Sequence, residues 1–374
     1  MNKQQDVFSV SVGGKITVES KHKVGPENLP LVYTPGVADV CMAIAENSTL
    51  AKNYTIAGNT ILVVSDGSAV LGLGNIGPKG ALPVMEGKAL LFKELANVNA
   101  FPIVLNTQDT EDIIQTIKNI SPGVAGINLE DISAPRCFEI ETRLKNELDI
   151  PVFHDDQHGT AIVVLAGLIN SAKVVNKDIK KLSIIISGSG SAGVAVAKLL
   201  HFYGISNILV TDSKGIISSN RTDLNDSKKD LLKITNSPDL SGSVSDAVRG
   251  RDVFIGVSTS NVINEENVRS MADKPIIFAM SNPIPEITPE KAFLGGAYIV
   301  ATGSSKFPNQ INNVLVFPGL FRGLIDSGVN KITNSHMVNI SEALANLIEN
   351  PDKENIIPSL FDKRVVPTVA SVFK

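Results

Sequence analysis

Short apolar runs rich in β-branched residues alternate along this chain with longer stretches of helical periodicity. The apolar runs lie at residues 60–65, 101–105, 124–129, 151–153, 182–186, 207–210, 253–257, 276–279 and 298–301. Runs this short, without polar alternation, are typical of strands buried in a parallel sheet. Between them, the pattern predicts helices near residues 86–97, 110–119, 134–148 and 160–175. Strands that alternate with helices predict an α/β fold with parallel sheets and right-handed crossovers.

The order of these elements predicts two domains, and a chain of 374 residues is long enough for about two. The helix predicted at residues 160–175 leads from the first group of strands into the second, so we place the boundary at its start. The first domain then covers residues 1–160. The second covers residues 161–374 and ends in a tail that begins as an amphipathic helix at Ile340.

Two further elements are predicted near the N-terminus. Residues 15–20 alternate like a short strand. Residues 37–45 carry an apolar stripe at helical spacing, formed by Val37, Val40, Cys41 and Ile44. That stripe predicts a buried helix face, so Cys41 is expected to be a small core residue and not a reactive thiol.

The strand at residues 182–186 opens a unit with the spacing of a dinucleotide-binding turn, Gly188-Ser189-Gly190-Ser191-Ala192-Gly193. In such a G-x-G-x-x-G turn the first glycine permits the tight turn, the second lets the backbone approach a pyrophosphate, and the third lets the helix pack on the strand. Asp212 lies just past the next strand, where an acid can bind a ribose 2′-hydroxyl. The unit predicts a Rossmann-type, doubly wound domain that binds NAD or NADP. A doubly wound domain without a nucleotide is the alternative.

Composition and charge exclude several classes of partner. The chain is 43% hydrophobic, which supports a full core, and its net charge of −4 gives no basic footprint for nucleic acid. The most apolar run, residues 161–169, is too short to span a bilayer, and no signal-peptide core follows the first residues. Cys41 and Cys137 define no disulfide framework. We therefore expect a cytoplasmic protein with neither a nucleic-acid nor a membrane partner.

Acidic pairs follow two predicted strands of the first domain, Glu130-Asp131 and Asp155-Asp156. Ligand sites of open parallel sheets lie at the carboxyl ends of the strands, so the two pairs can converge. Converging carboxylates repel unless a cation joins them, and oxygen ligands favour Mg²⁺ or Mn²⁺. Solvated acids are the alternative. A zinc site built on His154 and His158 would require both to lie on one helix, and a strand end followed by a helix start makes them diverge.

Other polar residues carry chemistry only if the fold places them in a cleft. Lys88 heads the apolar face of a predicted helix, where desolvation and a metal would lower its pKa toward that of a base; a solvated lysine is the alternative. Tyr33 precedes Pro35-Gly36 and is either a cleft residue or a core tyrosine. Asn282 and the pair Asn312-Asn313 are candidates to bind a carboxylate or an amide, or are turn-forming residues.

Taken together, these motifs resemble the malic enzyme family, and most closely its short bacterial and archaeal branch. The resemblance runs nearly end to end. It rests on residues 14–16 with Val18, 33–38, 66–67 with 72–77, 83–88, 128–131, 153–156 with 158–160, 281–283 and 307–314. The chain departs from the pattern at Leu82, where some members have lysine, and at residues 304–306, where many have Arg-Ser-Asp.

The resemblance implies the oxidative decarboxylation of L-malate to pyruvate and CO₂, with reduction of NAD or NADP and a need for Mg²⁺ or Mn²⁺. Decarboxylation of oxaloacetate and assembly into a homodimer are expected on the same ground. The resemblance implies these roles: Lys88 as general base, Tyr33 as general acid, Glu130, Asp131 and Asp156 as metal ligands, Asp155 beside the metal, and Asn282, Asn312 and Asn313 as contacts of substrate and nicotinamide.

Two other functions stay open. An amino-acid dehydrogenase would pair a catalytic lysine with the same kind of second domain, but it would not need the clustered acids. A nucleotide sensor without activity would have lost Lys88, Tyr33 or a metal carboxylate, and none is lost. For the cofactor, the charge of Asp212 favours NAD, whereas Lys214 would be able to bind the 2′-phosphate of NADP.

Overall fold

The computed structural model describes residues 8–374, and its first sheet has four parallel strands in the order β2-β1-β3-β4. These strands are β1 (Thr60–Ser65), β2 (Asn99–Val104), β3 (Gly126–Leu129) and β4 (Val152–His154). The helices between them are α5 (Gly77–Ala96), α6 (Thr110–Ile120) and α7 (Arg136–Glu147). Strands β1, β3 and β4 are buried along their whole length, which explains their continuous apolar sequence.

The second sheet has the order β10-β9-β8-β5-β6-β7 and is parallel except for its last strand. Its strands are β5 (Ile184–Ser187), β6 (Ile208–Asp212), β7 (Gly215–Ile216), β8 (Val253–Gly256), β9 (Ile276–Ala279) and β10 (Ile299–Thr302). The helices of this half are α9 (Ser191–Tyr203), α10 (Asp226–Leu232), α11 (Val244–Val248), α12 (Glu265–Arg269) and α13 (Pro289–Leu294). Strand β5 lies between β6 and β8, so the strand order reverses there and opens a ligand crevice at the carboxyl ends. This arrangement confirms the α/β prediction.

Helix α8 (Asp155–Val175) joins the two sheets. It begins directly after β4 and packs against α9 and α15 (Asn334–Asn346). Most of its residues are buried, because it lies between the two halves and is apolar on nearly every side. The boundary predicted at residue 160 falls inside this helix, so one element carries Asp155 and Asp156 at the first sheet and contributes to the core beside the second.

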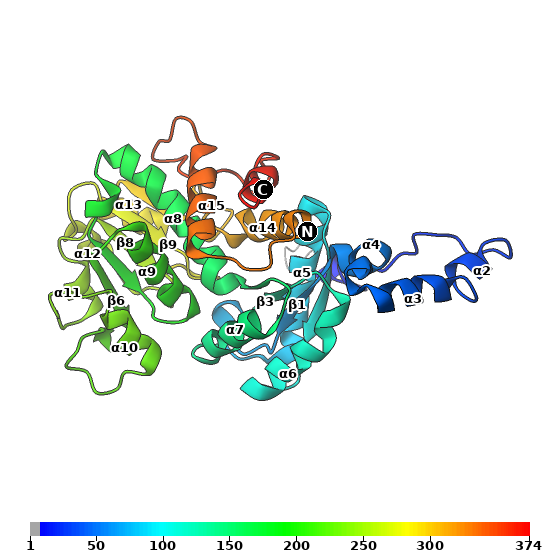
Figure 1. Cartoon of the computed structure of the whole chain (residues 1–374). Coiled ribbons are helices and arrows are strands. Elements are labelled where there is room, and N and C mark those ends of the chain that lie inside the picture. Colours follow the sequence, from blue (N-terminus) through cyan, green and yellow to red (C-terminus); the bar gives the residue numbers. More distant parts are fainter. Residues whose placement is uncertain (1–7) are drawn as a thin grey trace.

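The C-terminal segment packs on both halves (Figure 1). Helix α14 (Phe317–Ser327) lies on α5, and α15 (Asn334–Asn346) lies on α8. Helix α16 (Val365–Ser371) then packs on α14. A single large core of buried side chains runs from the first sheet through α8 to these helices, and it fixes the two sheets relative to each other.

The described part of the chain starts against this body and then extends away from it as an arm, which we define as residues 21–54 (Figure 1). It contains α2 (Leu29–Val32), α3 (Val37–Glu46) and α4 (Ala51–Tyr54). None of the residues of α3 is buried, and Cys41 is exposed, so the predicted burial of this helix is wrong for the single chain. Residues 15–20 form no strand; instead, the backbone N–H of Lys15 donates to Glu86 and its Nζ donates to the carbonyl of Pro83.

Short 3₁₀ turns complete the chain: η1 (Ser48–Leu50), η2 (Ile56–Asn59), η3 (Leu71–Leu73), η4 (Ser121–Gly123), η5 (Ile179–Lys181) and η6 (Asn313–Leu315). The start of α5 differs from the prediction, because the helix begins at Gly77 and includes Pro83. Glycine and proline in residues 77–83 suggested a loop, but the packing of α5 against β1 and β2 overrides that local preference. Lys88 therefore lies in the middle of the helix.

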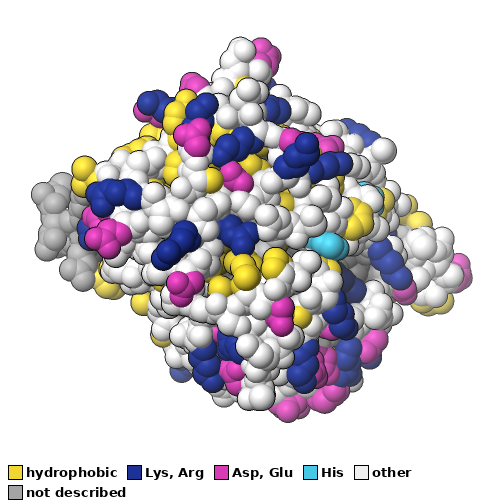
Figure 2. Space-filling model, turned by 90° about the vertical axis from the view of Figure 1, so that its left-hand side faces the viewer, with side chains coloured by type: hydrophobic (Ala, Val, Ile, Leu, Met, Phe, Trp, Pro, Cys, Tyr) yellow, Lys and Arg dark blue, Asp and Glu magenta, His cyan; other side chains and the backbone are white. Residues whose placement is uncertain are grey.

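Two helical segments are long and apolar enough to cross a membrane by length and composition alone, Leu29–Glu46 and α8. Helix α8 is largely buried as a core helix, and the other segment is broken between α2 and α3. Each is therefore weak evidence for a membrane partner. The face that carries α11 and α12 shows basic and acidic side chains interspersed (Figure 2). It has no stripe of one sign that would suit nucleic acid.

Candidate active site

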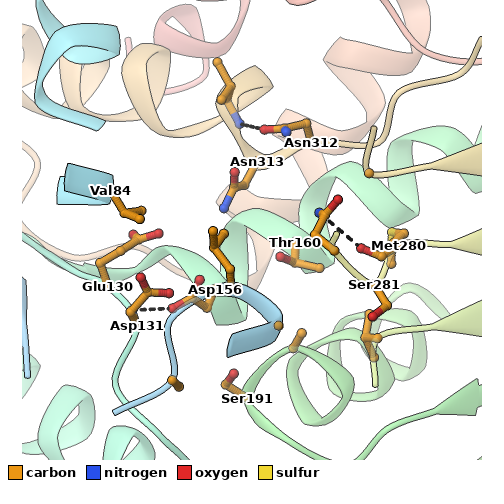
Figure 3. A pocket seen from close by; sticks show the side chains of 18 of the residues that line it. Val84, Glu130, Asp131, Asp156, Thr160, Ser191, Met280, Ser281, Asn312 and Asn313 are labelled. Carbon is orange, nitrogen blue, oxygen red and sulfur yellow. Dashed lines mark hydrogen bonds between the residues drawn. The ribbon is translucent and has the colours of Figure 1, made fainter. Parts of the chain in front are cut away.

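Three of the predicted metal ligands meet at the carboxyl edge of the first sheet. Glu130 and Asp131 follow β3, and Asp156 lies in the first turn of α8 directly after β4. Strands β3 and β4 are neighbours, with Leu129 opposite His154, so the residues that follow them emerge side by side. One carboxylate oxygen of each of the three acids lies within 4.8 Å of the others. Their side chains point toward one another on one side of a pocket (Figure 3).

The electrostatics of this acid cluster fit a divalent cation. Burial, together with the charges of neighbouring acids, raises the pKa of Asp131 to about 9. Burial likewise raises the pKa of Glu130 to about 7 and that of Asp156 to about 6. Oδ2 of Asp131 is buried and has no hydrogen-bond partner among the described residues. Three carboxylates held this close are costly without a positive partner, and Mg²⁺ or Mn²⁺ supplies one.

The backbone at Asp131 has a strained conformation that helps to position the acid cluster. Its φ of 55° lies in the left-handed region, which costs a residue with a side chain on the order of 1–3 kcal/mol. Its backbone N–H donates to Oδ2 of Asp156 at 2.7 Å. The turn after β3 is thereby tied to the start of α8, and the two acidic pairs are held in register.

Lys88 reaches the same pocket from the middle of α5. Its Nζ donates to Oε1 of Glu130 and to Oδ2 of Asp155, both at 2.5 Å, and lies 4.5 Å from the centre of the Phe317 ring. Burial lowers the pKa of Lys88, but the charges of Asp155 and Glu130 outweigh burial and raise it above its ordinary value. The predicted lowering of this pKa is therefore wrong for this arrangement of protein groups. The alternative of a solvated lysine is also excluded, since Lys88 is buried.

The pocket beside the acid cluster is a cavity of about 550 Å³ between the two sheets. Its far wall includes Ser191 and Ala192 at the start of α9, and Ser281 and Asn282 after β9. Asn312 and Asn313 close it from above, with the Asn313 amide directed toward the acids (Figure 3). The side chain of Asn312 also accepts a hydrogen bond from the N–H of Val314, so it holds this turn in place. All three predicted asparagines therefore line the cavity that contains Lys88.

A second cavity of about 760 Å³ adjoins the first along the glycine-rich turn. Gly188, Ser189, Gly190 and Asp212 line it, and both cavities share Val257 and Ser258. Gly188 has a φ of +120°, and a Cβ on Gly193 would lie 1.9 Å from the carbonyl oxygen of Gly188. A Cβ on Gly190 would meet only open space, so the backbone there is free to approach a pyrophosphate at the N-terminus of α9.

Tyr33 is the one predicted site residue that the structure keeps apart from the rest. It lies on the arm between α2 and α3, and its side chain is 67% exposed. It does not line the cavity that contains Lys88. The alternative of a core tyrosine is also wrong. Within a single chain, α2 and α3, which flank Tyr33, lie away from the two sheets (Figure 1).

Glu141 on α7 was not predicted as part of this region. It is buried behind the acid cluster, where it accepts a hydrogen bond from the backbone N–H of His154 at 3.0 Å. It also contacts Nε2 of His158 at 2.8 Å and forms an ion pair with Lys145. His158 contacts Glu141 through its ring, whereas both ring nitrogens of His154 are buried without a hydrogen-bond partner among the described residues, so the two rings lie in different environments.

Comparison with known proteins identifies the family of this arrangement. The model of the malic enzyme NAD-binding domain matches residues 157–372, and the model of the malic enzyme N-terminal domain matches residues 15–112 and 106–145. The chain belongs to the malic enzyme family. Malic enzymes are NAD(P)-dependent oxidoreductases that decarboxylate malate, so the predicted family, fold class, enzyme class and dinucleotide cofactor are confirmed.

Several relatives are similar over nearly the whole chain. The NAD-dependent malic enzyme of Geobacillus stearothermophilus is 52% identical, over 99% of this chain and 78% of its own. The NADP-dependent malic enzyme of Halomonas elongata is 41% identical, over 98% of this chain and 90% of its own. The solved structure of the NAD-dependent malic enzyme from Thermotoga maritima is 47% identical, with a TM-score of 0.95, and the match covers 100% of this chain and 99% of that one.

Proposed function

We propose that this malic enzyme oxidises L-malate and decarboxylates the product to pyruvate and CO₂ in the cavity that contains Lys88. One observation carries the proposal: a buried lysine, three carboxylates poised for a cation and the N-terminus of a dinucleotide-binding helix line one connected space. An amino-acid dehydrogenase would use the lysine but would have no need for Glu130, Asp131 and Asp156 to converge. Decarboxylation of added oxaloacetate follows from the same groups.

Glu130, Asp131 and Asp156 would hold the divalent cation. When bound, such a cation supplies a Lewis acid that polarises the C2 oxygen of malate and stabilises negative charge on it after CO₂ leaves. A cation bound to Glu130 would also offset the negative charge that now favours the protonated form of Lys88. Asp155 accepts from Lys88 and lies beside the acid cluster, so it orients the amine and is available to receive a proton from it.

Lys88 is the proposed general base. Its Nζ removes the proton of the C2 hydroxyl as hydride leaves C2 for the nicotinamide, and the amine then holds that proton inside the buried pocket. Asn282, Asn312 and Asn313 offer amide groups along the opposite wall, where they would bind the carboxylates of malate and the nicotinamide amide. The glycine-rich turn from Gly188 to Gly193 would bind the pyrophosphate.

The test of this function is the absorbance of reduced nicotinamide with L-malate, Mn²⁺ and either NAD or NADP. We expect a signal with pyruvate as product that a chelator abolishes and added Mn²⁺ restores. A chelator-resistant signal, or a product that keeps all four carbons, would contradict the proposed role of the acid cluster. L-Glutamate in place of L-malate is the control, and turnover of glutamate would favour the amino-acid dehydrogenase.

We further propose that the protein works as a homodimer in which the arm packs on a second copy of the chain. The arm exposes many large apolar side chains, including Leu31 and Met42 at 74% and 61%. Helix α3 has the apolar stripe of a packed helix, but none of its residues is buried within the described part of the chain. A twofold dimer would cover both arms with equivalent contacts.

The same dimer would complete the active site. Tyr33 lies on this arm, and the proposed acid that protonates C3 of the enolate is missing from the pocket of its own chain. We propose that each chain supplies Tyr33 to the pocket of its partner. The proton held by Lys88 would then replenish the hydroxyl of Tyr33.

Sedimentation of the full chain tests the assembly. We expect the mass of a dimer, and we expect Leu31→Lys combined with Met42→Lys to give monomers, because two charges would be buried in the interface. Leu294→Lys is the matched control, since Leu294 is 71% exposed but lies on α13. A monomeric native chain, or a double variant that stays dimeric, would contradict the proposal. We place the enzyme in the cytoplasm, because its two cysteines, Cys41 and Cys137, are free, as is usual in a reducing compartment.

A further inference from the structure

Glu286 is a fully buried acid whose hydrogen-bond partners are backbone N–H groups. It lies between β9 and α13. Its Oε1 accepts a hydrogen bond from the N–H of Ser258, and its Oε2 accepts one from the N–H of Ser281, both at 3.0 Å. Burial raises the pKa of this carboxyl, and the two N–H groups oppose that rise. Because each oxygen faces a donor, the geometry suits the ionised carboxylate, which only accepts hydrogen bonds.

The carboxylate bridges the ends of two neighbouring strands. Strands β8 and β9 pair with Gly256 opposite Ala279, the last residue of each. Ser258 and Ser281 lie just past these ends, so Glu286 spans the turns after both strands. It also lies directly on the backbone of β8, since a Cβ on Gly256 would be 2.3 Å from Cδ of Glu286. A shift of either turn would therefore break a buried hydrogen bond, which is costly.

These two turns form the wall where the two cavities meet. Ser258 lines both cavities, and Ser281 and Asn282 line the one that contains Lys88. Figure 3 shows Ser281 across that cavity from the acid cluster. A dinucleotide with its pyrophosphate at the start of α9 must pass this wall to bring its nicotinamide to Lys88. Glu286 itself lines neither cavity, so it acts on the ligands only through the turns that it holds.

We propose that Glu286 is a positioning residue for hydride transfer, which fixes the wall that holds the nicotinamide ring against C2 of malate. Glutamine in its place has one acceptor oxygen, and its NH₂ group would face one of the two N–H donors. That donor would lose its partner, and its turn would shift. The inference rests on the proposed function, because it concerns the step in which malate loses its hydride. Decarboxylation of oxaloacetate transfers no hydride, so it depends on the acid cluster and not on the placement of the ring.

The experiment compares Glu286→Gln with the native full chain. Stopped-flow absorbance with L-malate, Mn²⁺ and NAD should show hydride transfer slowed about 100-fold, the usual cost of a misplacement on the order of 1 Å. Release of pyruvate from added oxaloacetate should be nearly unchanged. The affinity for NADH, measured by its fluorescence, should fall about tenfold, because one N–H of the wall loses its acceptor. ADP-ribose, which lacks the nicotinamide, should bind as before. Glu290→Gln, an exposed acid of α13, is the control and should change none of these.

A second variant, Gly256→Ala, disturbs the same contact without removing the charge. Its added Cβ would be 2.3 Å from Cδ of Glu286, so the carboxylate would have to move from its place between the two N–H groups. We expect the same selective loss of hydride transfer and of NADH affinity. This variant keeps the inference testable if Glu286→Gln does not fold, and binding of ADP-ribose reports that either variant has folded.

Three outcomes would overturn the inference. The first is unchanged hydride transfer in both variants. The second is an equal fall in hydride transfer and oxaloacetate decarboxylation, and the third is an equal loss of NADH and ADP-ribose affinity. Either of the last two, or loss of every activity in both variants, would make Glu286 a residue of general stability. The binding comparison needs no turnover. A native chain that does not oxidise malate would contradict the proposed function, whereas a selective loss of NADH affinity in the variants would still place Glu286 behind the nicotinamide.

Discussion

At the scale of single residues, the site depends on how Lys88 shares its proton. Two carboxylates hold the amine, and the large phenyl ring of Phe317 covers one side, so this lysine has no access to bulk water comparable to that of a surface lysine. Its basicity is set by the charges next to it. The acids that hold it are also those that bind or flank the proposed cation, which links base strength to metal occupancy.

Substitution of this lysine should separate chemistry from binding. Lys88→Ala is expected to lower kcat by a factor of about 10²–10⁴, the usual contribution of a general base, with the affinity for NADPH nearly unchanged. Stopped-flow absorbance would measure hydride transfer, and fluorescence would measure cofactor binding. Lys93→Ala, an exposed lysine on the same helix, is the control. Unchanged malate oxidation in Lys88→Ala would remove Lys88 from the mechanism.

The sequence predicts a site residue only when its place follows from the predicted strands and helices. The acids Glu130, Asp131 and Asp156 are predictable, because strand ends of a parallel sheet converge by geometry. Glu286 is not, since nothing in the local pattern links it to the turn after β8. Glu141 did leave a signal. Cys137, Ile140 and Leu144 form an apolar stripe at helical spacing, and Glu141 lies within that stripe. A carboxylate at such a position indicates that it is buried against a partner of opposite charge.

At the scale of elements, the acid cluster depends on the junction between β4 and α8. Strand β4 is only three residues long, and its last residue, His154, leads directly into the helix that carries Asp155 and Asp156. Glu141 on α7 ties this junction down through the His154 backbone and the His158 ring. The buried charge of Glu141 is itself stabilised by His158 and Lys145, which lower its pKa although burial alone would raise it.

Removing the charge of Glu141 should weaken the support of the proposed metal ligand Asp156. Glu141→Gln keeps the shape but leaves Lys145 and His158 without a carboxylate, so we expect a loss of about 3–5 kcal/mol in stability. Affinity for Mn²⁺ should fall about 10–100-fold, as for other residues that support metal ligands. Thermal unfolding and a Mn²⁺ titration would measure the two effects. Glu139→Gln, exposed on the same helix, should change neither. Native Mn²⁺ affinity in Glu141→Gln would show that Glu141 serves stability alone.

The elements themselves were predictable where burial decides them. Strands β1, β3, β5, β8 and β9 are covered on both faces, and their continuous apolar sequence predicts this burial. The first turns of α5 were not predictable, because packing on the sheet outweighs two prolines and two glycines in residues 77–83. Helix α3 was predicted correctly as an element but not in its burial. Its apolar face is not buried by residues 8–374, and sequence periodicity does not say which chain will cover a face.

At the scale of the whole molecule, the two sheets and the arm have different relations to the pocket. Helix α8 and the large core hold the two sheets together, so the acid cluster, Lys88 and the dinucleotide turn belong to one chain. Tyr33 does not belong to this rigid body, because it lies on the arm between α2 and α3. If the arm serves the partner, each active site is built from two chains, and a twofold dimer has two such sites.

Hybrid dimers test whether Tyr33 acts in the active site of its own chain or in that of its partner. Chains with Tyr33→Phe and chains with Lys88→Ala would be co-expressed with different tags, and the mixed dimer purified. Each variant alone lacks a complete site. If Tyr33 acts on the partner, one site of the hybrid combines an intact Lys88 with an intact Tyr33, so about half of the wild-type kcat should return. If Tyr33 acts within its own chain, neither site is complete and no activity returns. The hybrid of a wild-type chain with the double variant reverses both expectations, since it has a complete site only when Tyr33 and Lys88 come from the same chain.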